Sequence, residues 1–287
     1  MATLTKLKQE IQFNGRLGSL LDALKSIAAS QFQSLERAMS VNPPVFTALE
    51  TIAGTFAIEQ LAHPFTQGEG PAGVIVVTSD TGLLGGLNQQ VVAAALQEYR
   101  RDPGELFVIG ERGAALLREQ GVTSQAFPGI QDSGRRALAG RVRDGALNRA
   151  LTGGLGTLSI VYPHALSFSV QRVEVVQALP CTAWLEGSSV SRGVRSGPVM
   201  LESSITDVVE YLVWMWLGQK LYEVFGLSRL AELSARAAHL EGSSQELGRR
   251  GRTLRQRYFR ERREAIDRNI RELFAAKSLF SSERGEP

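Results

Sequence analysis

The chain has 287 residues, a formal net charge of +3 and a single cysteine, Cys181. One cysteine excludes an intramolecular disulfide and favours a reducing environment, in which this thiol fills space rather than acting as a nucleophile. No stretch reaches the roughly 18 consecutive apolar residues that cross a bilayer, so we expect a soluble or peripheral protein of one or two domains. No charged and apolar leader opens the sequence, so we expect the mature chain to begin where the gene does.

The first 60 residues predict a long helix. Apolar residues recur at alternating steps of three and four along this stretch, which is typical of one helix face. They include Leu4, Leu7, Ile11, Leu21, Ala28, Phe32, Leu35 and Met39. Gly15 and Gly18 weaken the helix, so packing against another element must hold it. Pro43 and Pro44 remove two backbone donors, which predicts a break before the helix resumes towards Ile58.

A short apolar run, Val74 to Val77, predicts a buried strand, and the glycines that follow allow a sharp turn into a helix from Asn88 to Arg101. The glycine spacing matches neither the dinucleotide fingerprint nor the phosphate-binding loop. A tight turn is therefore favoured over a ligand site. Asp80, at the carboxyl end of the strand, is the best lone candidate for a functional carboxylate, although a brace for the turn is the favoured role.

The rest of the segment from 71 to 198 alternates strands with helices. Strands are predicted at Leu106–Ile109, Thr157–Tyr162 and Ser169–Leu179, and helices from Gly110 to Glu119 and from Arg135 to Leu151. Gly153–Gly154 and Gly187 to Gly197 are predicted loops. Strands joined by helices of this length predict a Rossmann-like α/β domain with a mostly parallel sheet.

A second long helix is predicted from about residue 203 to 280, with Ser203 or Ser204 as its cap and Asp207 in its first turn. It carries a heptad seam of apolar and small residues. The seam consists of Leu230, Leu233, Ala237, Leu240, Ser244, Leu247, Gly251, Leu254 and Tyr258. Pairing with the amino-terminal helix or with a second copy of the chain would both produce this pattern. Beyond Tyr258 the regular pattern ends, so a different environment is expected there.

Eight arginines cluster on this helix, at positions 249, 250, 252, 255, 257, 260, 262 and 263. Such a block suits nucleic acid, an anionic membrane, an acidic protein partner or simply a solvated face. Evidence for an enzyme is weak, because His63, His164 and His239 are scattered without metal-ligand spacing and no nucleophile–base grouping is present.

The loop after the first strand carries a more specific signal. It resembles the pattern Ser-Asp-Arg-Gly-Leu-Cys-Gly-Gly-Leu-Asn of the gamma subunits of F-type ATP synthases, with Thr81 and Leu84 in place of Arg and Cys. The matching residues are Ser79, Asp80, Gly82, Leu83, Gly85, Gly86, Leu87 and Asn88.

Both chain ends resemble the same family. Near the carboxyl end, Ala235-Arg236 and the stretch from Tyr258 to Leu273 are similar to family sequences, and residues from Leu7 to Ala29 match more loosely. The amino-terminal helix holds fewer basic residues than the family pattern, for example Gln9, Gln12 and Asp22. The chain is identified as a divergent member.

In gamma subunits the terminal helices form an antiparallel coiled coil inside the hexamer of alpha and beta subunits, and the sheet domain rests on the membrane rotor ring with the epsilon subunit. The resemblance implies a central-stalk rotor shaft that couples ion flow to ATP synthesis or hydrolysis by rotation. It implies no catalytic site, cofactor, metal or nucleic-acid partner, no membrane span, and a peripheral place on the cytoplasmic face of the cell membrane.

The implied organisation is a coiled-coil helix at 1–62, an α/β domain at 71–198, a coiled-coil helix at 203–280 and a tail at 281–287. Arg252, Arg255 and Arg260 are expected to contact acidic groups of the stator, since exposed ion pairs of about 0 to 1 kcal/mol suit a surface that repeatedly releases. The expected bearing tip comprises Ile266, Ile270, Leu273 and Phe274. The alternatives are a coiled-coil scaffold or nucleic-acid-binding protein, and a nucleotide-using α/β enzyme.

Overall fold

The computed structural model describes residues 2–39, 45–55, 61–181 and 202–282. The chain divides into two compact units. The helical unit contains residues 1–27 and 239–287, and the sheet unit contains residues 28–238. Two long helices, α1 (Ala2–Met39) and α8 (Ile205–Ser282), contribute residues to both units.

A sheet with the strand order β3-β2-β1-β4-β5 forms the centre of the sheet unit. Its strands are β1 (Ala72–Val77), β2 (Glu105–Ile109), β3 (Gln125–Phe127), β4 (Thr157–Ala165) and β5 (Gln171–Leu179). The first four strands in space pair in parallel, and β5 alone runs antiparallel, beside β4. The mostly parallel sheet expected from the sequence is confirmed.

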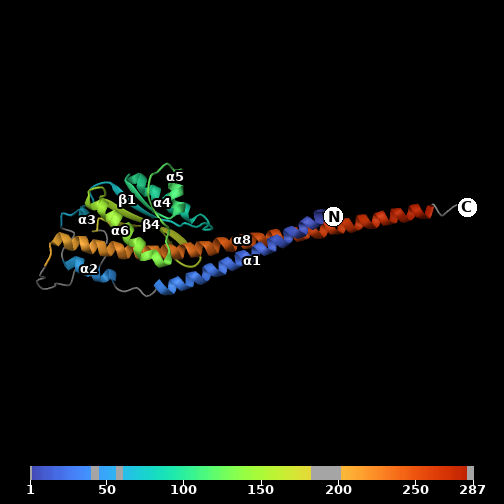
Figure 1. Ribbon diagram of the computed structural model, residues 1–287, viewed down its shortest axis with the longest axis horizontal. Helices are drawn as coiled ribbons and strands as arrows, with labels where there is room; N and C mark the ends of the chain where they lie inside the picture. The colour runs from blue at the N-terminus through green and yellow to red at the C-terminus, as the bar shows by residue number, and fades with distance from the viewer. Residues whose placement is uncertain (1, 40–44, 56–60, 182–201, 283–287) are drawn as a thin grey trace. The chain divides into compact units, whose positions relative to one another are not determined.

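Helices cover both faces of the sheet, which explains why every residue of β1 is buried and apolar or glycine. On one face α4 (Leu87–Arg101) and α5 (Glu111–Glu119) pack on alternate residues of β1 and β2. On the other face lie α6 (Arg135–Leu151) and the first third of α8, with α2 (Val45–Thr55) and α3 (Pro64–Gln67) at the margin. Figure 1 shows α4 and α5 on the opposite side of the sheet from α6 and α8.

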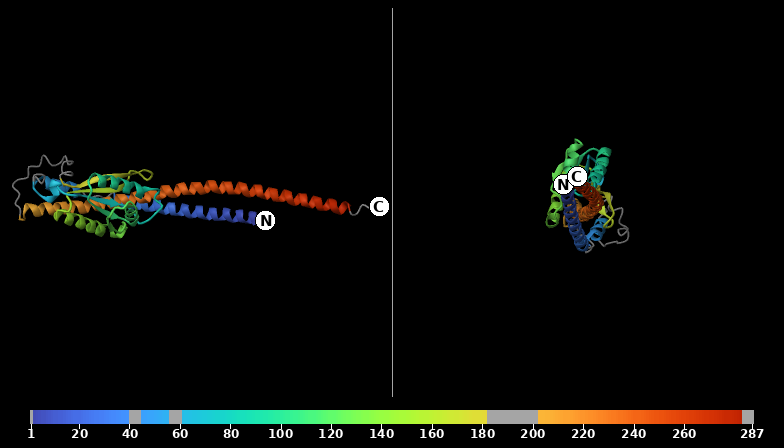
Figure 2. Two further views of the ribbon diagram at one scale, coloured as in Figure 1. Left: turned by 90° about the horizontal axis from the view of Figure 1, so that it is seen from above. Right: turned by 90° about the vertical axis from the view of Figure 1, so that its right-hand side faces the viewer.

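In the helical unit, α1 and α8 are antiparallel. Asn14 Nδ2 donates to the Leu247 carbonyl at 2.9 Å, Ser244 Oγ donates to Asp22 at 2.8 Å, and Lys25 Nζ lies 2.6 Å from Glu241. As the residue number increases along α1, the number of its partner on α8 decreases, which is the order of an antiparallel pair. Figure 2 shows the two segments side by side, with α8 continuing past the start of α1. The pairing expected from the heptads is present within one chain.

The seam residues of this unit face inward as the heptads predicted. Leu240 and Gly251 are buried and Ser244, Leu247, Leu254 and Tyr258 are half-buried, whereas the neighbouring arginines are exposed. Small residues permit the close approach, because a Cβ on Gly251 would lie 2.9 Å from Asn14 Nδ2.

Most predicted elements match the structure. Helix α6 has the predicted bounds, and Ser204 Oγ accepts a hydrogen bond from the Asp207 backbone N–H at 3.1 Å as the cap of α8. Strand β5 begins at Gln171 rather than at Ser169, because Ser167 to Val170 form the turn of the β4–β5 hairpin. Strand β3 was not predicted.

The predicted first helix is divided, since α1 ends at Met39 and a separate helix, α2, occupies Val45–Thr55. Pro43, Pro44, Ile58 and the loop from Gly187 to Gly197 lie outside the described residues. The division into four segments at 1–62, 71–198, 203–280 and 281–287 stays a prediction.

Candidate functional site

The glycine-rich loop between β1 and α4 carries the most specific sequence signal. Three of its residues have left-handed backbones, with φ of 65° at Leu83, 57° at Gly85 and 96° at Gly86. Glycine is favoured at such positions because it has no Cβ. The loop therefore turns tightly from a buried strand into a helix, and Leu83 is left about half exposed.

The first and last polar residues of the motif close this loop. Asn88 Nδ2 donates to Ser79 Oγ at 2.9 Å, and Asn88 Oδ1 accepts from the Ser79 backbone N–H at 3.3 Å. Ser79 Oγ in turn donates to the Thr81 carbonyl at 2.9 Å. These bonds fix the loop ends against each other without any ligand.

Asp80 braces the loop against its neighbours. Its carboxylate accepts hydrogen bonds from the backbone N–H of Glu111 at 2.8 Å and of Gly129 at 3.0 Å. Glu111 opens α5, so the negative charge also lies at the positive end of that helix. A Cβ on Gly129 would lie 2.5 Å from the carboxylate, so a side chain there would displace it. The geometry agrees with the favoured role of Asp80 as a brace.

The loop also packs on α8. Leu84 and Leu87 form a buried cluster with Ala231 and Ala235. Arg236 Nη2 donates to Thr81 Oγ1 at 2.6 Å. The loop motif and the Ala235-Arg236 motif, which carried separate parts of the resemblance, therefore meet in space. Thr81, a departure from the family pattern, supplies the acceptor.

A buried charged group adjoins this contact. Glu232 is 4% exposed and accepts a hydrogen bond from Arg229 Nη1 at 2.8 Å. Burial raises the pKa of Glu232 to about 7, against the opposing effect of Arg229 and Arg236. Burial likewise lowers the pKa of Arg236, against the attraction of Glu232.

Sequence reasoning did not identify Arg229 and Glu232. The available signal was their spacing with Arg236, which places three charges on neighbouring turns of one helix beside the apolar seam.

The candidate stator arginines, Arg252, Arg255 and Arg260, are all exposed on α8 in the helical unit. Among the residues that the structure describes, none of these three has a carboxylate within ion-pair distance. The nearby Arg249 does, through an exposed contact of 3.4 Å with Glu246. Three cations are thus available on the surface of this unit.

The candidate tip residues are exposed as well. Ile266 and Ile270 are each 45% exposed, and Leu273 and Phe274 are 71% and 69% exposed. Within the helical unit, the register of the antiparallel pair places the first residues of α1 opposite the stretch around Arg260. The four apolar side chains follow that stretch.

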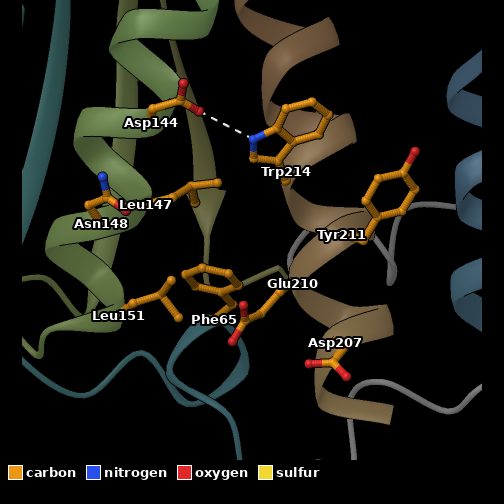
Figure 3. A pocket seen from close by; sticks show the side chains of 9 residues that line it. All are labelled: Phe65, Asp144, Leu147, Asn148, Leu151, Asp207, Glu210, Tyr211 and Trp214. Carbon is orange, nitrogen blue, oxygen red and sulfur yellow. Dashed lines mark hydrogen bonds between the residues drawn. The ribbon is translucent and has the colours of Figure 1, made fainter. Parts of the chain in front are cut away.

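A cavity of about 590 Å³ lies between α6 and the start of α8. Figure 3 shows Phe65 and Leu147 at its base and Asp144, Asp207 and Glu210 around it. Two of these carboxylates have partners, since Asp144 accepts from Trp214 Nε1 at 3.2 Å and Glu210 lies 3.5 Å from His63 Nε2. The third, Asp207, belongs to the first turn of α8, where a negative charge favours the helix.

The described residues contain no group of three or more His, Cys, Asp or Glu side chains that could hold a metal ion. No helix within the described ranges has the length and apolar character needed to cross a bilayer.

An α/β unit and an antiparallel two-helix unit, built on a shared pair of terminal helices, define the class of this protein. A family model described as ATP synthase matches residues 3–278. The chain therefore belongs to the ATP synthase gamma family.

The ATP synthase gamma chain of Clostridium beijerinckii is 25% identical over 284 residues, covering 95% of this chain and 96% of its own length. The corresponding protein of Delftia acidovorans is 26% identical over 288 residues, covering 96% of this chain and 98% of its own. A chain in the cryo-EM structure of the Euglena gracilis mitochondrial ATP synthase shares the fold, with a TM-score of 0.72, 14% identity and coverage of 100% and 97%.

Family membership confirms the resemblance seen in the sequence. As a gamma chain, the protein is a non-catalytic subunit of the central stalk. The scaffold, nucleic-acid and nucleotide-enzyme alternatives receive no support from these relatives.

Proposed function

We propose that this chain is the rotor shaft of an F-type ATP synthase, turning inside a hexamer of alpha and beta subunits and coupling ion flow through a membrane rotor ring to ATP synthesis or hydrolysis. The observation that carries the proposal is the antiparallel pairing of α1 with α8 within one chain, in a protein that also holds the family's α/β unit. The epsilon subunit and the rotor ring are the partners proposed for the sheet unit.

The surface of the helical unit supports a role in contacting the stator. Arg252, Arg255 and Arg260 present three exposed cations on a paired helix. Long cations at an exposed interface attract carboxylates weakly, by about 0 to 1 kcal/mol per pair. Such contacts can form and release during each turn. The exposed apolar residues from Ile266 to Phe274 are the proposed bearing tip.

The proposed location is peripheral, at the cytoplasmic face of the cell membrane. We also keep the division at 62, 71, 198, 203 and 280 as part of this proposal, because it follows the order of the helices and the sheet along the chain.

A charge-reversal experiment tests the function. Arg252, Arg255 and Arg260 are replaced by Glu in a tagged chain, and the assembled complex is purified. ATP-driven ion pumping per ATP hydrolysed should fall, while the circular dichroism and melting temperature of the isolated chain stay unchanged. The control is the same reversal at Arg100, Arg118 and Arg141, which are exposed on the sheet unit.

Two outcomes would contradict the proposal. The first is that the wild-type chain does not co-purify with alpha and beta subunits. The second is that the reversal and its control leave coupling equally intact.

A further inference from the structure

A short section of α8 within the sheet unit is enclosed to an unusual degree. From Leu230 to Ala235 every residue is buried, and Ser228, Glu232 and Ser234 are polar residues that are only 1%, 4% and 0% exposed. A helix covered on one face would bury only a stripe of residues. Burial of consecutive positions requires neighbours on all sides. We name the groups that surround Ser228 to Arg236 the collar.

Two parts of the collar come from connections of the sheet. The glycine-rich loop contributes Leu84 and Leu87, which pack on small residues of α8, together with Thr81, which accepts from Arg236. The β4–β5 turn contributes the Phe168 carbonyl, which accepts from Ser234 Oγ at 2.6 Å, and the first residue of β5, Gln171, donates to the same hydroxyl.

The other parts are helical. Phe32 of α1 packs on Leu230 and Leu233 and meets Phe168 edge to face at a ring separation of 5.1 Å. Asp132, in the short 3-10 helix η2 (Asp132–Gly134), lies 3.7 Å from Arg229 Nε. Every side of this section of α8 therefore meets a different element of the sheet unit.

The collar resists rotation of α8 about its own axis. Its apolar side chains are close-packed and interlock with their neighbours, so turning the helix would disturb that packing. Here three polar side chains of α8, those of Arg229, Ser234 and Arg236, contact partners on other elements, and turning the helix would break these contacts and leave the buried Ser234 hydroxyl without its partners. The partners are themselves fixed, because Asp80 and the Ser79–Asn88 pair tie the loop to β1, α4 and α5.

We infer that the collar is the joint through which torque passes between the sheet unit and α8, and that the contacts of Arg236 with Thr81 and of Ser234 with the Phe168 carbonyl are its positioning contacts. The inference rests on the proposed rotor function. The joint stays closed throughout rotation, so the sheet unit and the enclosed section of α8 turn as one body.

Substitution at Thr81 tests the joint with little risk to folding, because Thr81 is exposed. Thr81→Val removes the acceptor at nearly constant volume, and Thr81→Ser keeps it. Loss of this exposed, charge-assisted hydrogen bond should speed hydrogen exchange of the backbone amides of residues 79–88 by up to about fivefold. Thr81→Ser should exchange as the wild type does. This measurement uses the isolated chain, so it tests the collar even if the rotor assignment fails.

In the assembled complex, Thr81→Val should reduce ion pumping per ATP hydrolysed and Thr81→Ser should not. A purely structural role would leave this ratio unchanged and alter only the amount of complex. A Thr81→Cys, Arg236→Cys pair provides a second readout, because a short bis-maleimide can replace the lost contact and the chain's own Cys181 is buried. Bridging the pair should restore coupling.

The inference is overturned by either of two results. One is unchanged coupling in Thr81→Val, whether or not hydrogen exchange of the loop changes. The other is loss of coupling when the Cys pair is bridged, which would mean that the joint must open during rotation.

Discussion

Replacing Glu232 by Gln should change how the stability of the sheet unit depends on pH. The pKa of Glu232 is raised from 4.5 to about 7, chiefly by burial. The charges that face this carboxyl are Arg229 and Arg236 on α8 and Asp80 at the end of β1. The folded protein thus holds a proton between about pH 4.5 and pH 7 that the unfolded chain has already released.

The sign follows from this linkage. A raised carboxyl pKa contributes stability that is fully present below pH 4.5 and is lost as the pH rises to about 7. A tenfold change in a proton-binding equilibrium corresponds to about 1.4 kcal/mol. The loss of stability over this interval therefore amounts to about 3 kcal/mol, a figure that already includes the attraction of Arg229 and Arg236. The Gln variant cannot ionise, and its amide oxygen can still accept from Arg229.

Urea unfolding followed by tryptophan fluorescence at pH 5, 6, 7 and 8 provides the measurement. Trp216 is 4% exposed in the folded sheet unit and reports its unfolding. The free energy of unfolding of Glu232→Gln, minus that of the wild type, should rise from pH 5 to pH 8. Glu119→Gln, at an exposed position on α5, controls for the loss of one carboxylate. A difference that is constant over this range, or that falls, refutes the reasoning.

Two further changes probe the packing of α1 and α8. Phe32→Ala should destabilise the sheet unit by about 3 to 5 kcal/mol, because the ring is only 5% exposed. Phe13→Ala is the control and should cost under about 0.5 kcal/mol, because that ring is 68% exposed. Equal urea midpoints for the two variants would contradict this prediction. Gly248→Ala should stabilise the helical unit by about 0.5 to 1 kcal/mol, since nothing lies within 4 Å of the added Cβ. Gly251→Ala should gain less in thermal melts, because Asn14 must move and weaken its bond to α8.

Local periodicity was sufficient where an element buries one regularly repeating face of its own. The bounds of α6 follow from an apolar face that repeats regularly between a glycine turn and two glycines. The three residues of β3 carry no such pattern, since Gln125 and Ala126 are exposed. Their strand conformation comes from parallel pairing with β2, which lies almost 20 residues earlier in the chain. Such long-range pairing leaves no local signal.

The same distinction applies to the candidate site. The sequence indicated the loop motif and the favoured role of Asp80, because glycines and a strand end have meaning by themselves. Nothing in the sequence indicated that Glu232 is buried. Its position on a charged turn of a long helix is typical of a solvated side chain. Burial there results from four elements that meet around α8 from distant parts of the chain.

Small residues on α8 permit close approach in both units, but the partners differ. Gly251 and Ser244 leave room for side chains of α1. Two of the contacts that fix the register between α1 and α8, Ser244 with Asp22 and Lys25 with Glu241, lie at the surface. Ala231 and Ala235 admit the glycine-rich loop, and the polar groups beside them are buried. A surface contact can exchange its partner for water at little cost, whereas a buried one cannot. The buried polar contacts of α8 in the collar are therefore harder to replace with water than its contacts with α1 in the helical unit.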